Sequence, residues 1–391
     1  MFQKRHLSAV SIFILIICAI MVFQAHASPG MEVSSVSTGS LSSMESLAFS
    51  EVVPADEELV KVGTCRTAGM AWGISVHGNH AYVADGPGGL QIIDVSDPTR
   101  PKLTGTFETP GYAWGVTIND HIAYMADGPK GLQVIDIADP KNPRHLGECD
   151  TPGYARGIAL SGNYVYIADS SRGLQIIDVS DPENPVRAGS KRIAGNSRGI
   201  IVKGHFAYLT IYVPGQGSGL QVIDISSPED PEEVGHFATS GFAYTLALNE
   251  RHAYVVDWGS GLKVIDISDP TGPIQVGSYT IPWFARGIAV AGDYAYIVDG
   301  HEGIRVMNIK DPGDIVHIAD YDTPGYALGI SISGHYVYVA DGEAGLQVFQ
   351  FQASEKYATG ISYKSLPSLE FSPMDTFLLP IIMRNPQHRY G

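Results

Sequence analysis

The sequence predicts an all-β fold, a seven-bladed β-propeller with four antiparallel strands in each blade. Three observations predict it: a repeat of about 42 residues in seven copies, four short strand-like runs in each copy, and a strand ahead of the first copy that completes the last one. Four strands in a unit of about 40 residues are typical of propeller blades, which share one continuous core.

One tyrosine marks each copy of the repeat. Successive tyrosines are 42 residues apart, except across the fourth copy, where the spacing is 46. A glycine ahead of a short apolar run recurs with the same period, and Thr245 replaces it once. The tyrosines, which we expect to pack in the core, are Tyr82, Tyr124, Tyr166, Tyr208, Tyr254, Tyr296 and Tyr338.

The second copy shows the four strands and the turns between them. We expect strands at residues 115–118, 122–126, 132–137 and 145–149. Asn119-Asp120 suits a tight hairpin turn, and Asp127–Gly131 forms the next connection. The third connection, Ala138–Pro143, ends the strand with an aspartate and two prolines. No segment has a helical period with caps, which excludes a helical solenoid.

The two ends of the array indicate a closed ring. The seventh copy stops after its third strand, at residues 346–351. The missing fourth strand stands at the other end of the array, where residues 59–66 align with residues 102–108. Pairing of this N-terminal strand into the last blade closes the ring and removes exposed sheet edges.

The segments outside the repeats predict export. Residues 1–27 have a basic start at Lys4-Arg5 and an apolar run, and they end in small residues, as in a signal peptide; a retained membrane anchor is the alternative. Residues 28–58 are a Ser-rich linker that we expect to be disordered. The propeller spans residues 59–351, and residues 352–391 form a tail. Its apolar stretch suits a sorting or anchoring signal, a strand packed on the ring, or disorder, but it is too short to span a membrane.

The composition of the chain indicates which classes of binding partner it favours. The chain has 391 residues and a formal net charge of −16, which disfavours nucleic acid and anionic membranes and is compatible with cations, sugars and basic proteins. Cys65 and Cys149 occupy the same position of the repeat two copies apart, so we expect no disulfide between them. The sequence therefore predicts a secreted or cell-surface protein whose fold does not depend on disulfides.

The third strand of most copies carries a family resemblance. Segments such as Leu90–Asp94, Leu132–Asp136 and Leu174–Asp178, each followed by Val or Ile, a small residue and Asp-Pro, resemble the LVIVD repeat of bacterial and archaeal surface proteins. The resemblance covers residues 59–351. The chain departs from the pattern with Gln, Lys or Arg at the second position, and with Asn308 and Gln350 in place of the last aspartate. It implies a propeller at the cell surface and no particular activity.

One set of residues predicts a ligand site. In an alternating antiparallel blade, the connections between blades and the loops between second and third strands share one face, called the top face here. The residue before the innermost strand lies on this face and varies between large aromatics and arginine, the types that form binding hot spots. An alternative is that these side chains only plug the channel. The candidate ligand-binding residues at this position are Trp72, Trp114, Arg156, Arg198, Tyr244 and Arg286, and Tyr112 and Tyr154, two residues earlier in their blades, complete the set.

A second set is acidic and lies on the same face. An aspartate ends the second strand of every copy but the fourth, where Ile211 stands instead. Such carboxylates could surround one entrance of the central channel and attract calcium or a basic partner. Alternatively, each could cap its own turn. No other cofactor is predicted. These weak metal candidates are Asp85, Asp127, Asp169, Asp257, Asp299 and Asp341.

The sequence motif that could indicate catalysis does not lie in the structural context that such a motif requires. Gly195–Gly199 matches a Gly-x-Ser-x-Gly nucleophile pattern, but it lies between two strands rather than between a strand and a helix. We therefore name no catalytic residue. The sequence predicts an exported binding module for a protein, glycan or small ligand, with its site on the top face. The alternatives are a hydrolase or lyase that uses top-face carboxylates, with or without a metal, and a structural surface protein.

Overall fold

The computed structural model describes residues 58–213, 217–281 and 284–352, which form 28 strands in seven four-stranded antiparallel sheets. The predicted signal peptide, linker and tail lie outside the described residues, apart from Glu58 and Gln352. No helix occurs in the described part of the chain, so none there could span a membrane.

The strands follow the repeat. The first three blades contain β2(Gly73–His77), β3(His80–Ala84), β4(Leu90–Asp94) and β5(Lys102–Phe107); β6(Gly115–Asn119), β7(Ile122–Ala126), β8(Leu132–Asp136) and β9(Arg144–Cys149); and β10(Gly157–Ser161), β11(Tyr164–Ala168), β12(Leu174–Asp178) and β13(Val186–Lys191). The fourth and fifth contain β14(Asn196–Lys203), β15(Phe206–Val213), β16(Gly217–Asp224) and β17(Glu232–Thr239); and β18(Phe242–Leu248), β19(His252–Trp258), β20(Gly261–Asp266) and β21(Ile274–Tyr279). The sixth and seventh contain β22(Gly287–Ala291), β23(Tyr294–Val298), β24(Ile304–Asn308) and β25(Val316–Tyr321); and β26(Gly329–Ser333), β27(Tyr336–Ala340), β28(Leu346–Gln352) and β1(Glu58–Cys65).

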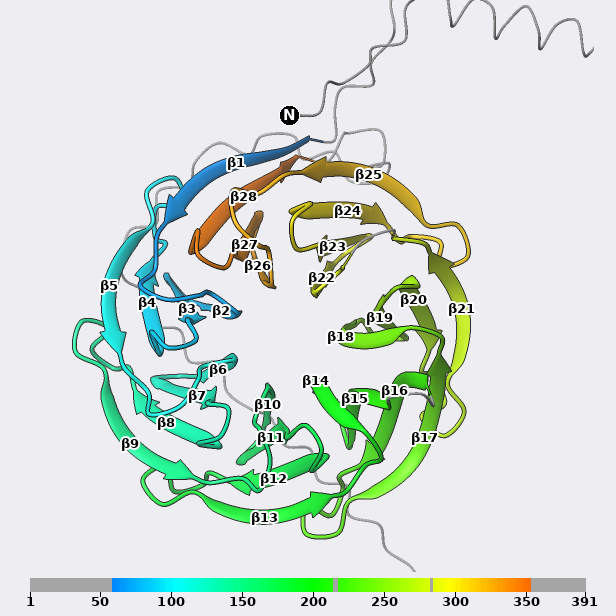
Figure 1. Cartoon of the computed structure of the whole chain (residues 1–391), viewed down its shortest axis with the longest axis horizontal. Coiled ribbons are helices and arrows are strands. Elements are labelled where there is room, and N and C mark those ends of the chain that lie inside the picture. Colours follow the sequence, from blue (N-terminus) through cyan, green and yellow to red (C-terminus); the bar gives the residue numbers. More distant parts are fainter. Residues whose placement is uncertain (1–57, 214–216, 282–283, 353–391) are drawn as a thin grey trace, which may run out of the picture. The chain divides into compact units, whose positions relative to one another are not determined.

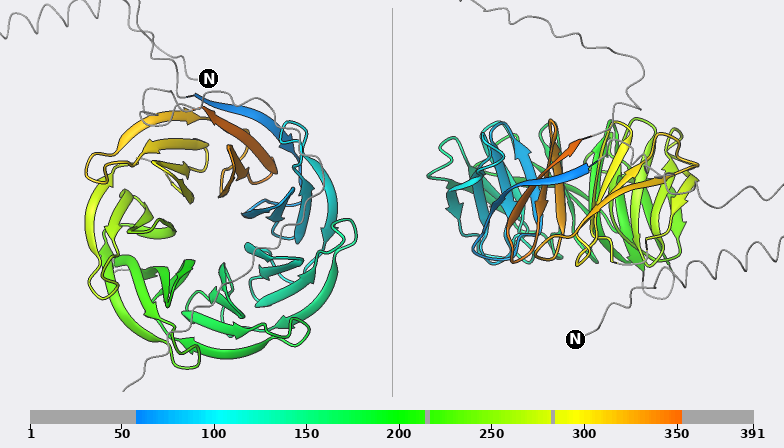
Figure 2. Two further views of the ribbon diagram at one scale, coloured as in Figure 1. Left: turned by 180° about the vertical axis from the view of Figure 1, so that it is seen from behind. Right: turned by 90° about the horizontal axis from the view of Figure 1, so that it is seen from above.

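The sheets stand around a central axis as the seven blades of a ring. The first strand of each blade lies innermost and the fourth lies on the outer edge of the ring (Figure 1). Seen edge-on, the strands run between two flat faces (Figure 2). Strand β1 pairs with β28, with Glu58 opposite Gln352, so the predicted closure by the N-terminal strand is confirmed.

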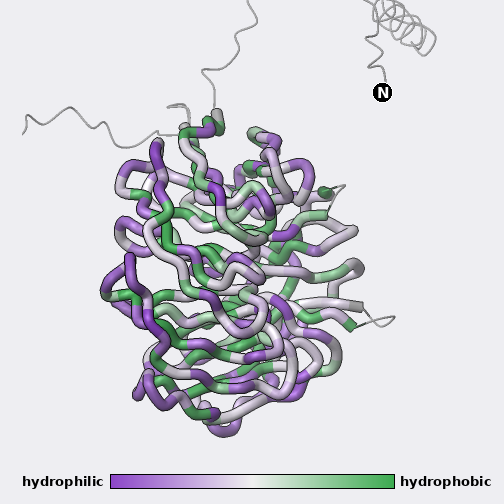
Figure 3. The backbone as a smooth tube through the Cα atoms, turned by 60° about the vertical axis from the view of Figure 1, so that its left-hand side comes forward, coloured by the Kyte–Doolittle hydropathy of each residue, from purple (hydrophilic) through white to green (hydrophobic). Residues whose placement is uncertain are grey.

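The core lies between neighbouring blades. The second and third strands are buried on both faces, as in β7, where four of five residues are buried. Apolar residues concentrate along the strands and many polar ones lie in the connecting turns (Figure 3). All seven repeat tyrosines are buried, as predicted. Each core cluster combines residues from two adjacent blades, as Tyr82 and Met125 do, so packing joins each blade to the next.

A glycine in the fourth strand sets how closely blades approach. A methyl group added to Gly189 of β13 would lie 2.0 Å from the carbonyl oxygen of Pro228, in the Asp-Pro-type turn of the next blade. Gly63, Gly105, Gly147, Gly235 and Gly277 face the equivalent proline in the same way. In the sixth blade this position is occupied by Ala319 of β25. The next blade is the seventh, which has no such turn because β1 supplies its fourth strand. The exception therefore follows from the closure.

Candidate functional site

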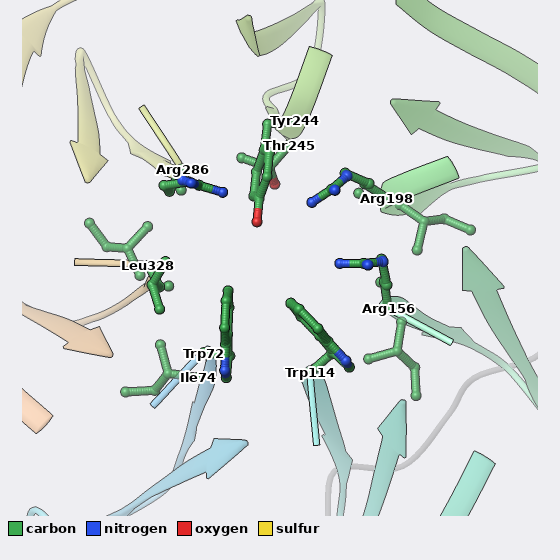
Figure 4. Close-up of a pocket in the computed structure, with 18 of the residues that line it drawn as sticks. Trp72, Ile74, Trp114, Arg156, Arg198, Tyr244, Thr245, Arg286 and Leu328 are labelled. Carbon is green, nitrogen blue, oxygen red and sulfur yellow. The ribbon is translucent and has the colours of Figure 1, made fainter. Parts of the chain in front are cut away.

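The residues that precede the innermost strands surround a cavity on the top face. In each blade an alanine or serine before this position is buried, as Ala71 and Ala113 are. Successive side chains of an extended chain point in opposite directions, so the next residue points toward the axis. The cavity has a volume of about 260 Å³ (Figure 4). Its rim, called the mouth here, consists of Trp72, Trp114, Arg156, Arg198, Tyr244, Arg286 and Leu328.

Backbone hydrogen bonds hold these residues in place. The amide of Trp114 donates to the carbonyl of Ala126 at 2.9 Å, and Arg156 and Arg286 make the same bond to the second strand of their own blades. In five blades the glycine after the rim residue lies against the rim residue of the next blade: a methyl group on Gly157 would lie 2.2 Å from the Arg198 carbonyl oxygen. The recurring glycine therefore permits the innermost strands to approach closely, which positions the rim.

One half of the mouth is apolar. The Trp72 and Trp114 rings are 4.3 Å apart, centroid to centroid, and the Trp72 Nε1 donates to the Tyr112 hydroxyl at 2.7 Å. Tyr154 packs edge-on against Trp114 at 6.0 Å. Both indole nitrogens lie away from the axis, so carbon atoms of the indoles face the centre (Figure 4). Leu328 of the seventh blade continues this wall.

The other half is cationic. The guanidinium groups of Arg156, Arg198 and Arg286 point toward the centre, as does the Tyr244 hydroxyl (Figure 4). Each guanidinium carbon lies near at least two aromatic rings. For Arg198 these are Phe242 at 5.0 Å and Tyr244 at 4.8 Å; for Arg156, Trp114 at 4.3 Å and Tyr154 at 5.1 Å; for Arg286, Tyr244 at 4.9 Å, Trp258 at 4.8 Å and Tyr326 at 5.6 Å. Such cation–π contacts fix the arginines without neutralising them.

The three arginines lack an acidic partner. None of them forms an ion pair with a carboxylate of the described residues. Arg156 donates to the Ser170 hydroxyl at 3.2 Å and Arg286 to the Tyr326 hydroxyl at 3.3 Å, both neutral groups. Burial lowers the pKa of Arg198, Tyr244 opposes this, and the charges of Arg156 and Arg286 lower it further. The mouth therefore concentrates positive charge in an acidic chain, since arginine stays protonated in proteins.

The six aspartates that end the second strands do not line this cavity. All are buried, each within its own blade. The Asp127 carboxylate accepts hydrogen bonds from the Thr109 hydroxyl at 2.7 Å and the Gly111 amide at 2.8 Å. Asp85 and Asp341 accept the equivalent pair, Asp169 accepts from Thr151, and Asp257 accepts from Gly241 and Ser260. Apart from the Ser260 contact of Asp257, these bonds tie the aspartates to the connection from the previous blade rather than to their own turns.

The sixth blade departs from this pattern. Ile281 stands where five other blades have a threonine, and the nearest cation to the Asp299 carboxylate is Arg305 at 4.0 Å. Burial raises the pKa of Asp299 to about 6, and Arg305 opposes the rise. Within the described chain, no group of three or more His, Cys, Asp or Glu side chains could hold a metal ion.

Other sequence features have local structural roles. Ser197 of the Gly-x-Ser-x-Gly match is buried at the start of β14, and its hydroxyl donates to the carbonyls of Ser170 and Gly173. The longer spacing of the fourth copy arises in the connection between β15, which ends at Val213, and β16, which begins at Gly217. Residues 214–216 lie outside the described part of the chain. Asp94 caps its turn by accepting from the Ser96 amide at 2.9 Å.

Sequence reasoning missed several residues that support the mouth. Trp258 packs on Phe284 with ring centroids 4.7 Å apart and on Arg286. Tyr212 stacks on Phe242 at 4.0 Å. The available signal was a break in the repeat, because Trp258 and Tyr212 stand where the five other blades have a glycine or serine after the aspartate.

Comparison with known proteins identifies the repeat. A family model of the LVIVD repeat matches residues 68–109, 110–151, 152–191, 194–239, 240–281, 284–323 and 324–349. No curated protein matches the chain.

Solved structures share the fold at low sequence identity. The Cps50 (Swd1) β-propeller domain of Myceliophteria thermophila is 14% identical, with a TM-score of 0.60 over 75% of this chain and 100% of that one. The computationally designed protein Ika8 is 10% identical, with a TM-score of 0.57 and coverage of 75% and 100%. BamB from Moraxella catarrhalis is 15% identical, with a TM-score of 0.52 and coverage of 75% and 98%. At these identities the likeness shows the fold alone.

Proposed function

The chain belongs to the LVIVD-repeat family, and on that premise we propose that it is an exported binding module whose mouth holds an anionic ligand. The observation that carries this proposal is the set of three arginines that converge on one cavity without an acidic partner among the described residues. Partly buried like charges cost free energy when nothing pairs with them. A bound anion offsets that cost, so the free protein is prepared for such a ligand.

The size of the cavity limits what enters it. A volume of about 260 Å³ lies just below the range typical of sites for drug-sized ligands, about 300–1,000 Å³. It suits a small molecule, one sugar unit or one side chain of a protein. A protein or glycan partner would therefore place a single anionic group in the mouth and contact the rest of the top face around it.

The positions of the first and last strand residues of the propeller support display at a surface. Glu58 at the start of β1 lies opposite Gln352 at the end of β28. Because β28 begins at a top-face turn, both residues lie on the opposite face. An anchor attached through either end would leave the mouth directed away from that surface.

The lining of the whole cavity favours binding over carboxylate catalysis. Its described residues are Trp, Tyr, Arg, Thr, Gly, Leu, Ile and Val, without an Asp, Glu, His, Cys or Ser that could act as a general base or nucleophile. The cavity also remains open at its centre (Figure 4), whereas a purely structural ring would be expected to fill it.

The test is calorimetric titration of the purified protein with sodium benzoate and with sodium sulfate at constant ionic strength. We expect at least one anion to bind, and binding to weaken at least tenfold when Arg156, Arg198 and Arg286 are all changed to Gln. The matched control changes three arginines away from the mouth, Arg100, Arg144 and Arg187, to Gln and should bind like the wild type. Absence of binding by both anions, or equal binding by the mouth variant, would contradict the proposal.

A further inference from the structure

The two halves of the mouth have opposite chemistry, and we infer from this that the ligand is an organic acid with a compact apolar body. This inference rests on the proposed anion site and specifies what the site selects. Trp72, Trp114 and Leu328 come from three consecutive blades and form the apolar half. The three arginines face them across the axis, with Tyr244 between Arg198 and Arg286 (Figure 4).

The apolar half contributes through area removed from water. Indole side chains bury large surfaces and contact flat ligands well. The Trp72 Nε1 is already bonded to Tyr112, and both indole nitrogens point away from the axis, so this wall presents carbon atoms to the cavity (Figure 4). Burial of apolar surface contributes roughly 25 cal/mol per Å². An inorganic anion has no apolar surface and gains nothing from this wall.

The space behind the rim extends the apolar surface. Below the mouth the cavity is bordered by the glycines that begin the innermost strands and by aliphatic side chains such as Ile74, Val116 and Ile158. Ile74 lies farther from the axis than Trp72 does (Figure 4). The cavity therefore offers an aliphatic border beneath a rim that carries the charge.

The cationic half specifies the other end of the ligand. Guanidinium groups bind carboxylates in two-point geometry. Aromatic rings flank Arg156, Arg198 and Arg286, which restricts their movement and reduces the ordering needed to bind an anion. A carboxylate at the rim can thus meet several arginines while its body contacts Trp72 and Trp114.

The shortage of polar groups on the apolar side argues against a heavily hydroxylated body. Tyr244 and Thr245 are the uncharged residues with side-chain hydroxyls among the described lining residues, and both lie on the arginine side. A sugar acid placed against Trp72 and Leu328 would leave hydroxyls without partners, and each unsatisfied buried group costs about 1–3 kcal/mol. An aromatic or alicyclic carboxylate avoids this cost.

The experiment compares four probes by tryptophan fluorescence titration of the purified protein at constant ionic strength. Benzoate has both features, benzyl alcohol lacks the charge, sulfate lacks the apolar body, and glucuronate carries the charge on a hydroxylated ring. We expect benzoate to bind at least tenfold more tightly than each of the others. Calorimetry repeats the series, so that binding without a fluorescence change is detected.

Two variants separate the contributions of the two halves. Trp114→Leu should weaken benzoate at least fivefold and leave sulfate unchanged, whereas Arg198→Gln should weaken both anions. Circular dichroism checks that each variant is folded, and Trp72→Leu replaces Trp114→Leu if that variant is not.

The outcomes distinguish the two proposals. Sulfate or glucuronate binding as tightly as benzoate, or Trp114→Leu weakening benzoate and sulfate equally, would overturn the amphipathic ligand and leave the anion site standing. Benzyl alcohol binding as tightly as benzoate would show that charge contributes nothing. That result, or binding by none of the probes, overturns the proposed function itself.

Discussion

At the scale of single residues, the buried Asp169 exchanges hydration for hydrogen bonds from the connection that precedes its blade. Asp169 is buried, and its carboxylate accepts a hydrogen bond from the Thr151 hydroxyl at 2.8 Å. Burial raises the pKa of Asp169 from 3.8 to about 6, while Thr151 and the Gly153 amide oppose the rise. The folded state therefore holds this proton at pH values where the unfolded chain has released it.

This linkage predicts a pH-dependent effect of Asp169→Asn. A raised pKa in the folded state means that the stabilisation is fully present below the unfolded value of 3.8 and is lost as the pH rises toward about 6. The free energy of unfolding of the wild type minus that of the variant should fall between these pH values and be constant above them. Urea denaturation at a series of pH values measures it.

Asp266→Asn is the control of opposite sign. Hydrogen bonds from Ser268, together with a smaller contribution from Arg251, lower the pKa of Asp266 to about 2. Its stabilisation is present above 3.8 and is lost as the pH falls toward 2. A constant difference for Asp169→Asn between pH 4 and 6 would show that this carboxyl is ionised equally in both states.

Single residues of the top face show what the sequence could predict and what it could not. Topology alone places Asp127 and Trp114 on the top face, and the structure agrees. The sequence could not show that Asp127 is buried whereas Trp114 lines the cavity. The hydrogen-bond partner of Asp127 is Thr109, which lies 18 residues earlier, in the connection from the previous blade. Likewise, the positions of the mouth arginines depend on rings of neighbouring segments, such as Trp258 beside Arg286, that no local pattern specifies.

At the scale of elements, the close contact between a fourth strand and the next Asp-Pro-type turn joins the blades. Gly189→Ala would place a methyl group 2.0 Å from the Pro228 carbonyl oxygen, so the backbones must separate. Overpacking of this kind costs about 1–3 kcal/mol, and thermal or urea unfolding should show the loss. Gly272→Ala is the control, since the nearest atom to its added methyl group is 3.6 Å away. Equal stability of both variants would contradict this role.

The strands themselves were predictable because each is short, apolar and bounded by turn residues. Predicted and observed bounds agree within about one residue in the second blade, where residues 122–126 match β7. The fourth blade differs more, since β15 and β16 continue to Val213 and from Gly217. The insertion lengthens the hairpin rather than the loop alone.

At the scale of the whole molecule, one strand pair closes the ring. Strand β1 pairs with β28 through seven residue partners from Glu58 to Cys65. Deletion of residues 58–66 removes this strand and exposes the edge of β28, so we expect loss of cooperative unfolding and aggregation. Deletion of residues 40–48, an equal length of the predicted linker, should leave the unfolding transition unchanged. Size-exclusion chromatography and calorimetry would show equal behaviour of the two variants if closure by β1 were dispensable.

Charge is also distributed on the scale of the whole chain. The net charge of −16 contrasts with three arginines at the centre of the top face that have no acidic partner in the described part of the chain. An acidic surface repels anions at a distance, and this repulsion weakens as salt rises. The mouth therefore selects anions by contact within a small cavity rather than by long-range attraction.

The most direct test of the mouth as an organic anion site is a crystal structure of the protein with 4-bromobenzoate, in which anomalous scattering locates the bromine. The account predicts the carboxylate within hydrogen-bonding distance of Arg198 and at least one of Arg156 and Arg286, with the ring against Trp72 and Trp114. An empty mouth at a saturating concentration, or the ligand bound only elsewhere on the ring, would contradict it.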